Sequence, residues 1–219
     1  MFKKIILALG LIFVLLTPLT AKSQNAEQIS SFESQIIVNP DASISVKEEI
    51  AYFFPSSKRG INRYIPIRYL DQTVNKHFKT RITNLTVTNK NGVPYLFSTS
   101  EDKTNLNIKI GDPAQTITGE HIYVISYDVS GVINYFDSYD ELYWNVTGNS
   151  WDVPIKNVQS VIQLPSGVQD DLIKTKCFSG ATGSLEQNCQ ASSVQTSANF
   201  SATDGPLTIV LGWNKGAVL

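Results

Sequence analysis

Alternation of apolar and polar residues limits what this sequence can fold into. Over residues 120–132, one face of an extended chain carries His121, Tyr123, Ile125, Tyr127 and Val129, and the other carries Ile122, Val124, Ser126 and Asp128. A period of two residues is typical of a β-strand with one face against a core. The face from His121 to Val129 is the more apolar, so we expect it to point inward.

Similar segments recur at intervals typical of an all-β sandwich. We expect strands over residues 32–38, 44–54, 81–88, 93–99, 106–110, 120–132, 135–146, 158–164 and 206–213. Asn39, Pro40 and Asp41 predict a turn between the first two, because Pro fixes its own φ and Asn and Asp bond nearby backbone. The sequence therefore predicts an all-β fold, a two-sheet β-sandwich that is immunoglobulin-like or of a related type.

Three segments do not fit simple alternation. Residues 55–70 contain Gly60 and Pro66 among apolar and basic residues, so we expect an irregular loop with an extended end. A short helix near Asp140 is possible, and residues 191–202 form either a strand or a loose loop. In the strand over residues 44–54, Glu48 shares a face with apolar residues and needs a structural reason to be there.

The first residues form a secretory signal pattern. Lys3 and Lys4 precede an apolar run over residues 5–16 that is too short to cross a bilayer, and small residues stand at Ala21 and Ser23. We expect a removable signal helix over residues 1–23 and one exported domain over residues 24–219. An uncleaved membrane anchor is the alternative.

Composition narrows the function classes. The chain is 42% hydrophobic and has a formal net charge of −1. Binding to a phosphate backbone needs a concentrated excess of Lys and Arg, so a nucleic acid partner is excluded. No motif indicates a cofactor.

Cys177 and Cys189 are the two cysteines of the chain. In an exported protein, two cysteines this close in sequence favour a disulfide. A metal site is the weaker alternative, because two thiolates supply half of a tetrahedral site and no His lies nearby. We therefore predict no metal at the cysteines.

A basic and aromatic group in the 60–69 loop is the first candidate binding site. It contains Arg63, Tyr64, Arg68 and Tyr69, with Arg59 directly before the loop. Arg and aromatic side chains are enriched at binding hot spots, and Arg binds anions with two parallel hydrogen bonds. The alternative is internal: Arg63 bonds loop carbonyls or pairs with Glu48 or Glu141.

An acidic and aromatic group is the second candidate. Residues 140–155 read DELYWNVTGNSWDVPI and include Asp140, Glu141, Trp144, Trp151 and Asp152. Paired carboxylates beside aromatic rings would suit glycoside hydrolysis, yet such acids are more often solvated and such Trp residues more often buried. Ca²⁺ held by Asp137, Asp140 and Glu141 is a further, weaker alternative, because the usual calcium loop is missing.

Several motifs are spread over the exported part of the chain: Gly60-Ile61-x-Arg63-x-Ile65-Pro66, Ile110-Gly111-Asp112, Thr118-Gly119-x-His121-x-Tyr123-x-Ile125-x-Tyr127, Asp140-Glu141-Leu142-Tyr143-Trp144-Asn145-Val146-x-Gly148 with Trp151 and Pro154, the Cys177–Cys189 loop and Gly216-Ala217. In these motifs the chain resembles a family of predicted bacterial membrane proteins, domain of unknown function 2207. The resemblance implies an extracytoplasmic β-sandwich ahead of a membrane helix and brings no assigned activity. We expect membrane association through a segment absent from this chain.

We therefore predict a noncatalytic binding or assembly module of the bacterial cell envelope, on the periplasmic or extracellular face. Its partner would be an envelope protein or a glycan. The binding residues would be Arg59, Arg63, Tyr64, Asp140, Glu141, Trp144 and Trp151. An envelope glycan hydrolase that uses Asp140, Glu141 or Asp152 is the rival hypothesis.

Overall fold

The computed structural model describes residues 26–71, 76–180 and 186–218. For residues 69–71 and 76–78 it describes the backbone alone. Strands dominate the described residues, and the one helical element among them is a single 3₁₀ turn, η1 (Asp170–Leu172). The predicted signal segment, residues 1–23, lies outside the described residues. None of the helices in the described ranges is long and apolar enough to cross a membrane.

Seven strands form the largest sheet, in the order β14-β15-β12-β1-β2-β9-β6. Their bounds are β1 (Gln28–Val38), β2 (Ile44–Lys58), β6 (Arg81–Asn89), β9 (Ile117–Ser130), β12 (Asn157–Gln163), β14 (Cys189–Val194) and β15 (Ser197–Thr203). β1 pairs with β12 in parallel, and its pairing with β2 is antiparallel. The predicted hairpin is confirmed, with a turn closed by the bond from the Asn39 backbone N–H to the Ser43 carbonyl at 2.8 Å.

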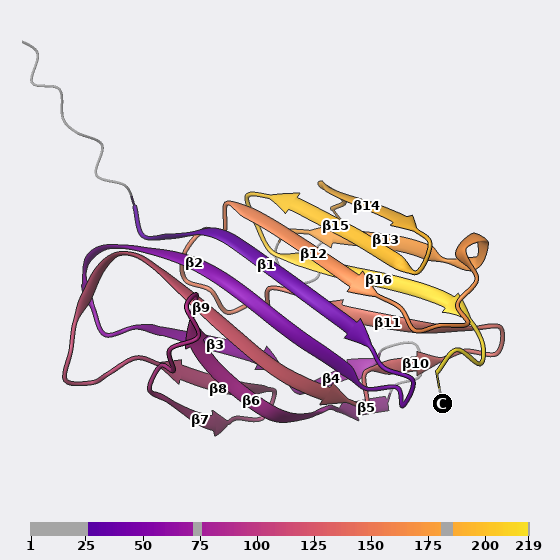
Figure 1. Cartoon of the computed structure of the whole chain (residues 1–219), viewed down its shortest axis with the longest axis horizontal. Helices are drawn as coiled ribbons and strands as arrows, with labels where there is room; N and C mark the ends of the chain where they lie inside the picture. The colour runs from indigo at the N-terminus through magenta and orange to yellow at the C-terminus, as the bar shows by residue number, and fades with distance from the viewer. Residues whose placement is uncertain (1–25, 72–75, 181–185, 219) are drawn as a thin grey trace, which may run out of the picture.

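Two smaller sheets lie behind the seven-stranded sheet in Figure 1. One has the order β10-β11-β16-β13, with β10 (Ile133–Tyr135), β11 (Tyr139–Asn145), β13 (Lys174–Ser179) and β16 (Leu207–Asn214). The other has the order β3-β8-β7, with β3 (Ile61–Pro66), β7 (Phe97–Glu101) and β8 (Asn105–Ile110). A two-stranded ribbon of β4 (Arg68–Asp71) and β5 (Lys76–Lys79) completes the fold. The predicted all-β sandwich is confirmed, and its second layer is divided between separate sheets.

Inward-facing residues follow the alternation seen in the sequence. Tyr123, Ile125, Tyr127 and Val129 of β9 are each at most 2% exposed, so the predicted core face is correct. They join one cluster of buried side chains that also includes Phe32, Leu142 and Trp213. The core therefore lies between the seven-stranded sheet and the sheets behind it.

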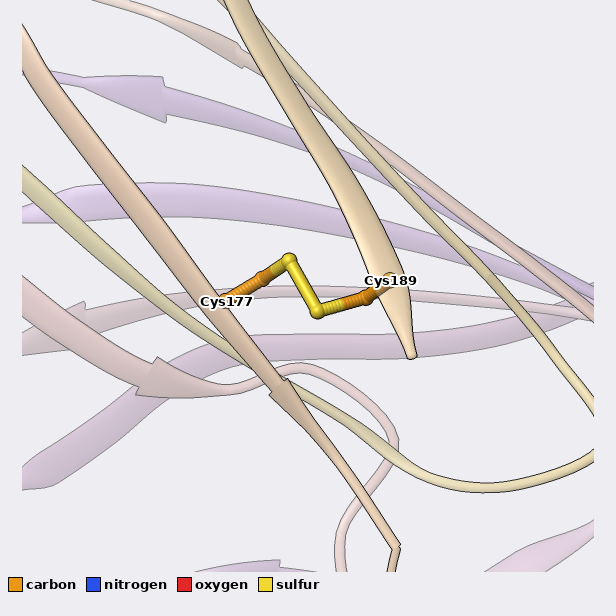
Figure 2. The surroundings of a disulfide bond; sticks show 2 residues. All are labelled: Cys177 and Cys189. Carbon is orange, nitrogen blue, oxygen red and sulfur yellow. A yellow bond between two sulfur atoms is a disulfide. The ribbon is translucent and has the colours of Figure 1, made fainter. Parts of the chain in front are cut away.

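A disulfide ties the two layers together. Cys177 lies on β13 of the four-stranded sheet and Cys189 begins β14 of the seven-stranded sheet, with their Cα atoms 6.2 Å apart (Figure 2). The predicted pairing is therefore present, and it connects edge strands of different sheets. Covalent connection at this place restricts separation of the layers at their β13 and β14 edges.

Three local expectations were wrong. Residues 61–66 and 68–71 form strands, although Gly60 and Pro66 suggested an irregular loop. The reason is that Ile61, Arg63 and Ile65 all face the core, so the alternation continues through an arginine. The segment near Asp140 belongs to β11 and not to a helix, and a turn between β10 and β11 interrupts the single strand expected over residues 135–146. Of the two alternatives for residues 191–202, the strand is correct, because they fall in the hairpin of β14 and β15.

Candidate functional site

Arg63 is completely buried beneath the loop that follows β11. It points inward from β3, between Ile61 and Ile65, and is 0% exposed. Its Nε donates to Glu48 Oε2 at 2.8 Å, and its Nη2 donates to Glu48 Oε1 at 2.7 Å. A bidentate arrangement of this kind is the strongest contact that Arg makes with a carboxylate. The unexpected acid on the apolar face of β2 therefore serves as the counterion of Arg63.

Backbone carbonyls accept the other Arg63 N–H groups. Nη1 donates to the carbonyls of Tyr64 at 2.7 Å and Thr147 at 2.8 Å, and Nη2 also donates to Val146 at 3.1 Å. These bonds and the two to Glu48 match the five donors of a guanidinium. Arg63 on β3 thus connects β2 to the loop after β11, where Thr147 lies 84 residues from Arg63 in sequence.

Tyr127 completes the buried group. Its hydroxyl donates to Glu48 Oε1 at 2.6 Å from β9, the neighbour of β2. Burial, reinforced by the Glu48 charge, holds the pKa of Tyr127 well above its ordinary value. Burial disfavours the charge of Arg63, but the attraction of Glu48 outweighs it and raises the pKa of Arg63. We call Arg63, Glu48, Tyr127 and the three acceptor carbonyls the Arg63 network.

The loop over the network needs a glycine at one position. Gly148 has φ +73°, and a Cβ there would lie 2.5 Å from Arg63 Nη1 and 2.9 Å from the Tyr64 carbonyl oxygen. Asn145 Oδ1 accepts the Gly148 backbone N–H at 3.0 Å, and Trp151 Nε1 donates to the Thr147 carbonyl at 2.7 Å. The Thr147 carbonyl therefore accepts from both Arg63 and Trp151. These contacts give a structural reason for Asn145, Gly148 and Trp151 in this segment.

The acidic residues of the same segment are directed to different places. Asp140 is 1% exposed, and its Oδ1 accepts from Lys215 Nζ at 2.7 Å. Glu141 is the next residue of β11, so its side chain points to the opposite face of the sheet. Asp152 lies beyond β11, and its charge contributes to the raised pKa of Tyr52 on β2, after burial and Glu27. Asp140 and Glu141 therefore do not form the facing pair that glycoside hydrolysis requires.

The residues predicted for binding separate into internal and surface positions. Arg63, Asp140 and Trp144 are buried, with Trp144 6% exposed. Tyr64, Glu141 and Trp151 are partly exposed, and Arg59 is exposed, with its Nε donating to the Pro113 carbonyl at 2.9 Å. Of the alternatives for Arg63, pairing with Glu48 and bonding to loop carbonyls are both present. The surface positions remain predicted contacts.

Two members of the site had no sequence prediction. Tyr127 was expected in the core, but its hydrogen bond to Glu48 was not predicted, although β9 lies next to the strand that carries Glu48. Lys215 was missed because it lies 75 residues from Asp140. Within the described ranges, no three His, Cys, Asp or Glu side chains are grouped so that they could hold a metal ion.

A family model identifies the family of the chain and assigns no activity. The model of the DUF2207 predicted membrane protein N-terminal domain matches residues 28–213. The uncharacterized protein YciQ of Escherichia coli strain K12 is 25% identical over 170 residues, which cover 74% of this chain and 26% of the relative. The chain thus spans about a quarter of the length of that relative.

Solved structures with some likeness to the chain are distant. An M1 zinc metallopeptidase from Deinococcus radiodurans has 8% identity and a TM-score of 0.44, with 86% of this chain and 43% of that chain covered. A leukotriene A4 hydrolase from Saccharomyces cerevisiae has 7% identity and a TM-score of 0.45, with coverages of 85% and 29%. Likeness at this level carries no functional information.

Proposed function

The chain belongs to the DUF2207 family of predicted membrane proteins, and from this premise we propose that it is a noncatalytic extracytoplasmic module of the bacterial cell envelope. The module binds an envelope protein or a glycan, and it is the ectodomain of a membrane protein. It needs no cofactor, and the buried charges serve to hold its shape.

The Arg63 network is the observation that carries this proposal. A catalytic or ligand-binding guanidinium must present free donors to a substrate, whereas the donors of Arg63 are used inside the protein. Glu48 likewise accepts from Arg63 and Tyr127 and is 0% exposed. Truncating one partner of such a buried pair leaves an uncompensated charge, so the network is suited to fixing geometry.

The loop fixed by the network is the proposed recognition surface. Asn149, Ser150 and Asp152 are exposed, and Trp151 is partly exposed beside them. Trp151 is held by the Thr147 carbonyl that also binds Arg63. Holding a recognition loop in one conformation reduces the entropy lost on binding. Arg63 is therefore a positioning residue for a surface that it does not itself reach.

The disulfide supports export. Cystine bonds persist in oxidising compartments and are rare in the cytosol. Fusion of alkaline phosphatase after Leu219 tests the location, because this enzyme folds into its active form only after export. Active fusions support the extracytoplasmic location, and inactive fusions with a stable chain would contradict it.

Site-directed photo-crosslinking in the native host tests the recognition surface. The full chain carries benzoylphenylalanine in place of exposed Asp152, and a matched chain carries it in place of exposed Gln159 on β12. We expect an envelope adduct from position 152 and none from position 159. Digestion with protease or with lysozyme then distinguishes a protein from a glycan. Identical adduct patterns at both positions, or no adduct at 152, would refute the proposed surface.

A further inference from the structure

The turn between β10 and β11 carries a group of exposed aromatic side chains. Tyr135, Phe136 and Tyr139 are 54%, 38% and 39% exposed. The rings of Phe136 and Tyr139 are stacked, with centroids 4.6 Å apart and planes inclined by 21°. The Phe136 backbone N–H donates to the Tyr139 carbonyl at 3.0 Å and closes the turn. We call these three residues the aromatic tip.

A lysine that directly follows the last strand, β16, lies beside the aromatic tip. Lys215 Nζ is 5.2 Å from the centroid of the Tyr135 ring, and it also donates to Asp140. Its side chain is 43% exposed. Because Tyr139 pairs with Asn214, β16 brings the end of the described chain alongside this turn. Figure 1 shows the C-terminal end of the chain beside β10.

The chemistry of this group matches a bilayer surface. Tyrosine rings settle at the level of lipid headgroups, because they are apolar with one polar end. The Lys215 side chain is 43% exposed, so its ammonium group meets headgroup phosphates from where it is held by Asp140, with its methylene chain among apolar neighbours. Asp137, exposed in the same turn, opposes deep insertion. The group is therefore suited to shallow contact with headgroups.

We propose that the aromatic tip, with Lys215, rests on the outer surface of the membrane and orients the domain. The family of predicted membrane proteins supplies the reason to choose a lipid partner over a soluble one. β11 runs from Tyr139 to Asn145, so the Asn149–Asp152 surface begins at the far end of this seven-residue strand. At about 3.3 Å per residue, that end lies roughly 20 Å from the tip. The tip thus directs the recognition loop away from the bilayer; this consequence and the choice of the outer surface rest on the proposed function.

Quenching by brominated lipids tests the contact. The purified chain with a C-terminal histidine tag is attached to vesicles of phosphatidylcholine and phosphatidylglycerol that contain a nickel-chelating lipid. Phe136→Trp places a reporter in the aromatic tip. Val194→Trp places a matched reporter on β14, at a residue that is 66% exposed. Fluorescence of the unsubstituted chain is subtracted, since it has three native Trp residues.

We expect dibrominated phosphatidylcholine to reduce the fluorescence of the Trp at position 136 and leave that at position 194 unchanged. Combining Phe136→Trp with Tyr135→Ser and Tyr139→Ser should lessen the quenching. Because the tag follows the C-terminal end beside the tip, full quenching at 136 that persists in the Tyr135→Ser, Tyr139→Ser variant would show that the tether alone sets the proximity. Equal quenching at 136 and 194 would show that the tip does not orient the domain, and no quenching at 136 would leave the tip to a protein partner. Each of these results would overturn the lipid contact, and none depends on the crosslinking at position 152.

Discussion

Arg63 and Glu48 form a bidentate ion pair inside the sandwich, with nitrogen–oxygen distances of 2.8 and 2.7 Å and side chains that are 1% and 0% exposed. They come from strands of different sheets, so the pair joins the two layers. Burying two charges is costly unless their remaining groups are satisfied. Here Tyr127 and backbone carbonyls provide those bonds.

Replacement of Gly148 should damage the loop over this pair. Gly148→Ala places a Cβ 2.5 Å from Arg63 Nη1, so we expect the free energy of unfolding to fall by about 2–5 kcal/mol, from backbone strain and overpacking together. Gly92→Ala is the matched control, because Gly92 has φ +79° and nothing within 4 Å of the new Cβ. It should lose only about 1–2 kcal/mol. Chemical denaturation measures both, and equal losses would mean that the contact with Arg63 is unimportant.

Two buried tyrosines should respond differently to loss of the hydroxyl. Tyr127→Phe removes a donor to the Glu48 carboxylate and should lower the free energy of unfolding by about 1.5–3 kcal/mol. Tyr123→Phe should be neutral or slightly stabilising, because the Tyr123 hydroxyl is buried with no hydrogen-bond partner in the described part of the chain. Denaturation at neutral pH compares the variants. A larger loss for Tyr123→Phe than for Tyr127→Phe would contradict the assignment.

The same tyrosines predict sensitivity to alkali. Burial raises the pKa of Tyr52, Tyr123 and Tyr127 in the folded protein. The folded state then holds protons that the unfolded chain releases above about pH 10, so stability is complete below that pH and declines above it. Tyr123→Phe and Tyr127→Phe should each reduce the slope of the decline. An unfolding free energy that stays constant or rises between pH 9 and 11 would refute this prediction.

Opening the disulfide should loosen the contact between β13 and β14. The Cys177→Ser, Cys189→Ser double variant should lose about 3 kcal/mol, as for closure of a loop of this size. Thermal unfolding with and without reductant gives the comparison, and the reduced chain should resemble the double variant. Reduction that is complete by thiol titration yet leaves the midpoint unchanged would count against a stabilising role.

Local alternation was enough to predict strands such as β1, β2 and β12 and the core face of β9, because each depends on neighbouring residues. Glu48 was visible as an exception on an apolar face, and that was the main sequence signal of the Arg63 network. β3 was missed because a buried arginine looks like a surface residue in a hydrophobicity pattern. Glycine and proline beside it strengthened the wrong assignment.

Long-range relationships were beyond the reach of such patterns. The parallel pairing of β1 with β12 places Phe32 opposite Val158. These residues are far apart in sequence, so a pattern of neighbouring residues cannot predict their contact. The contact of Lys215 with Asp140 and the division of the second layer depend on the assembled sheets. The sequence could therefore identify the candidate residues, but whether each one faced inward or outward required the fold.

A double-mutant cycle on Arg63 and Glu48 tests most directly whether the charged centre of the site is structural. The variants Arg63→Met and Glu48→Gln should each lower the free energy of unfolding by about 3–5 kcal/mol, because each leaves a buried group without its partner. The double variant should lose far less unfolding free energy than the sum of the two single losses, because neither charge is then left buried without its partner. Additive losses, or single variants that unfold like the unsubstituted chain, would contradict the structural role of the Arg63 network.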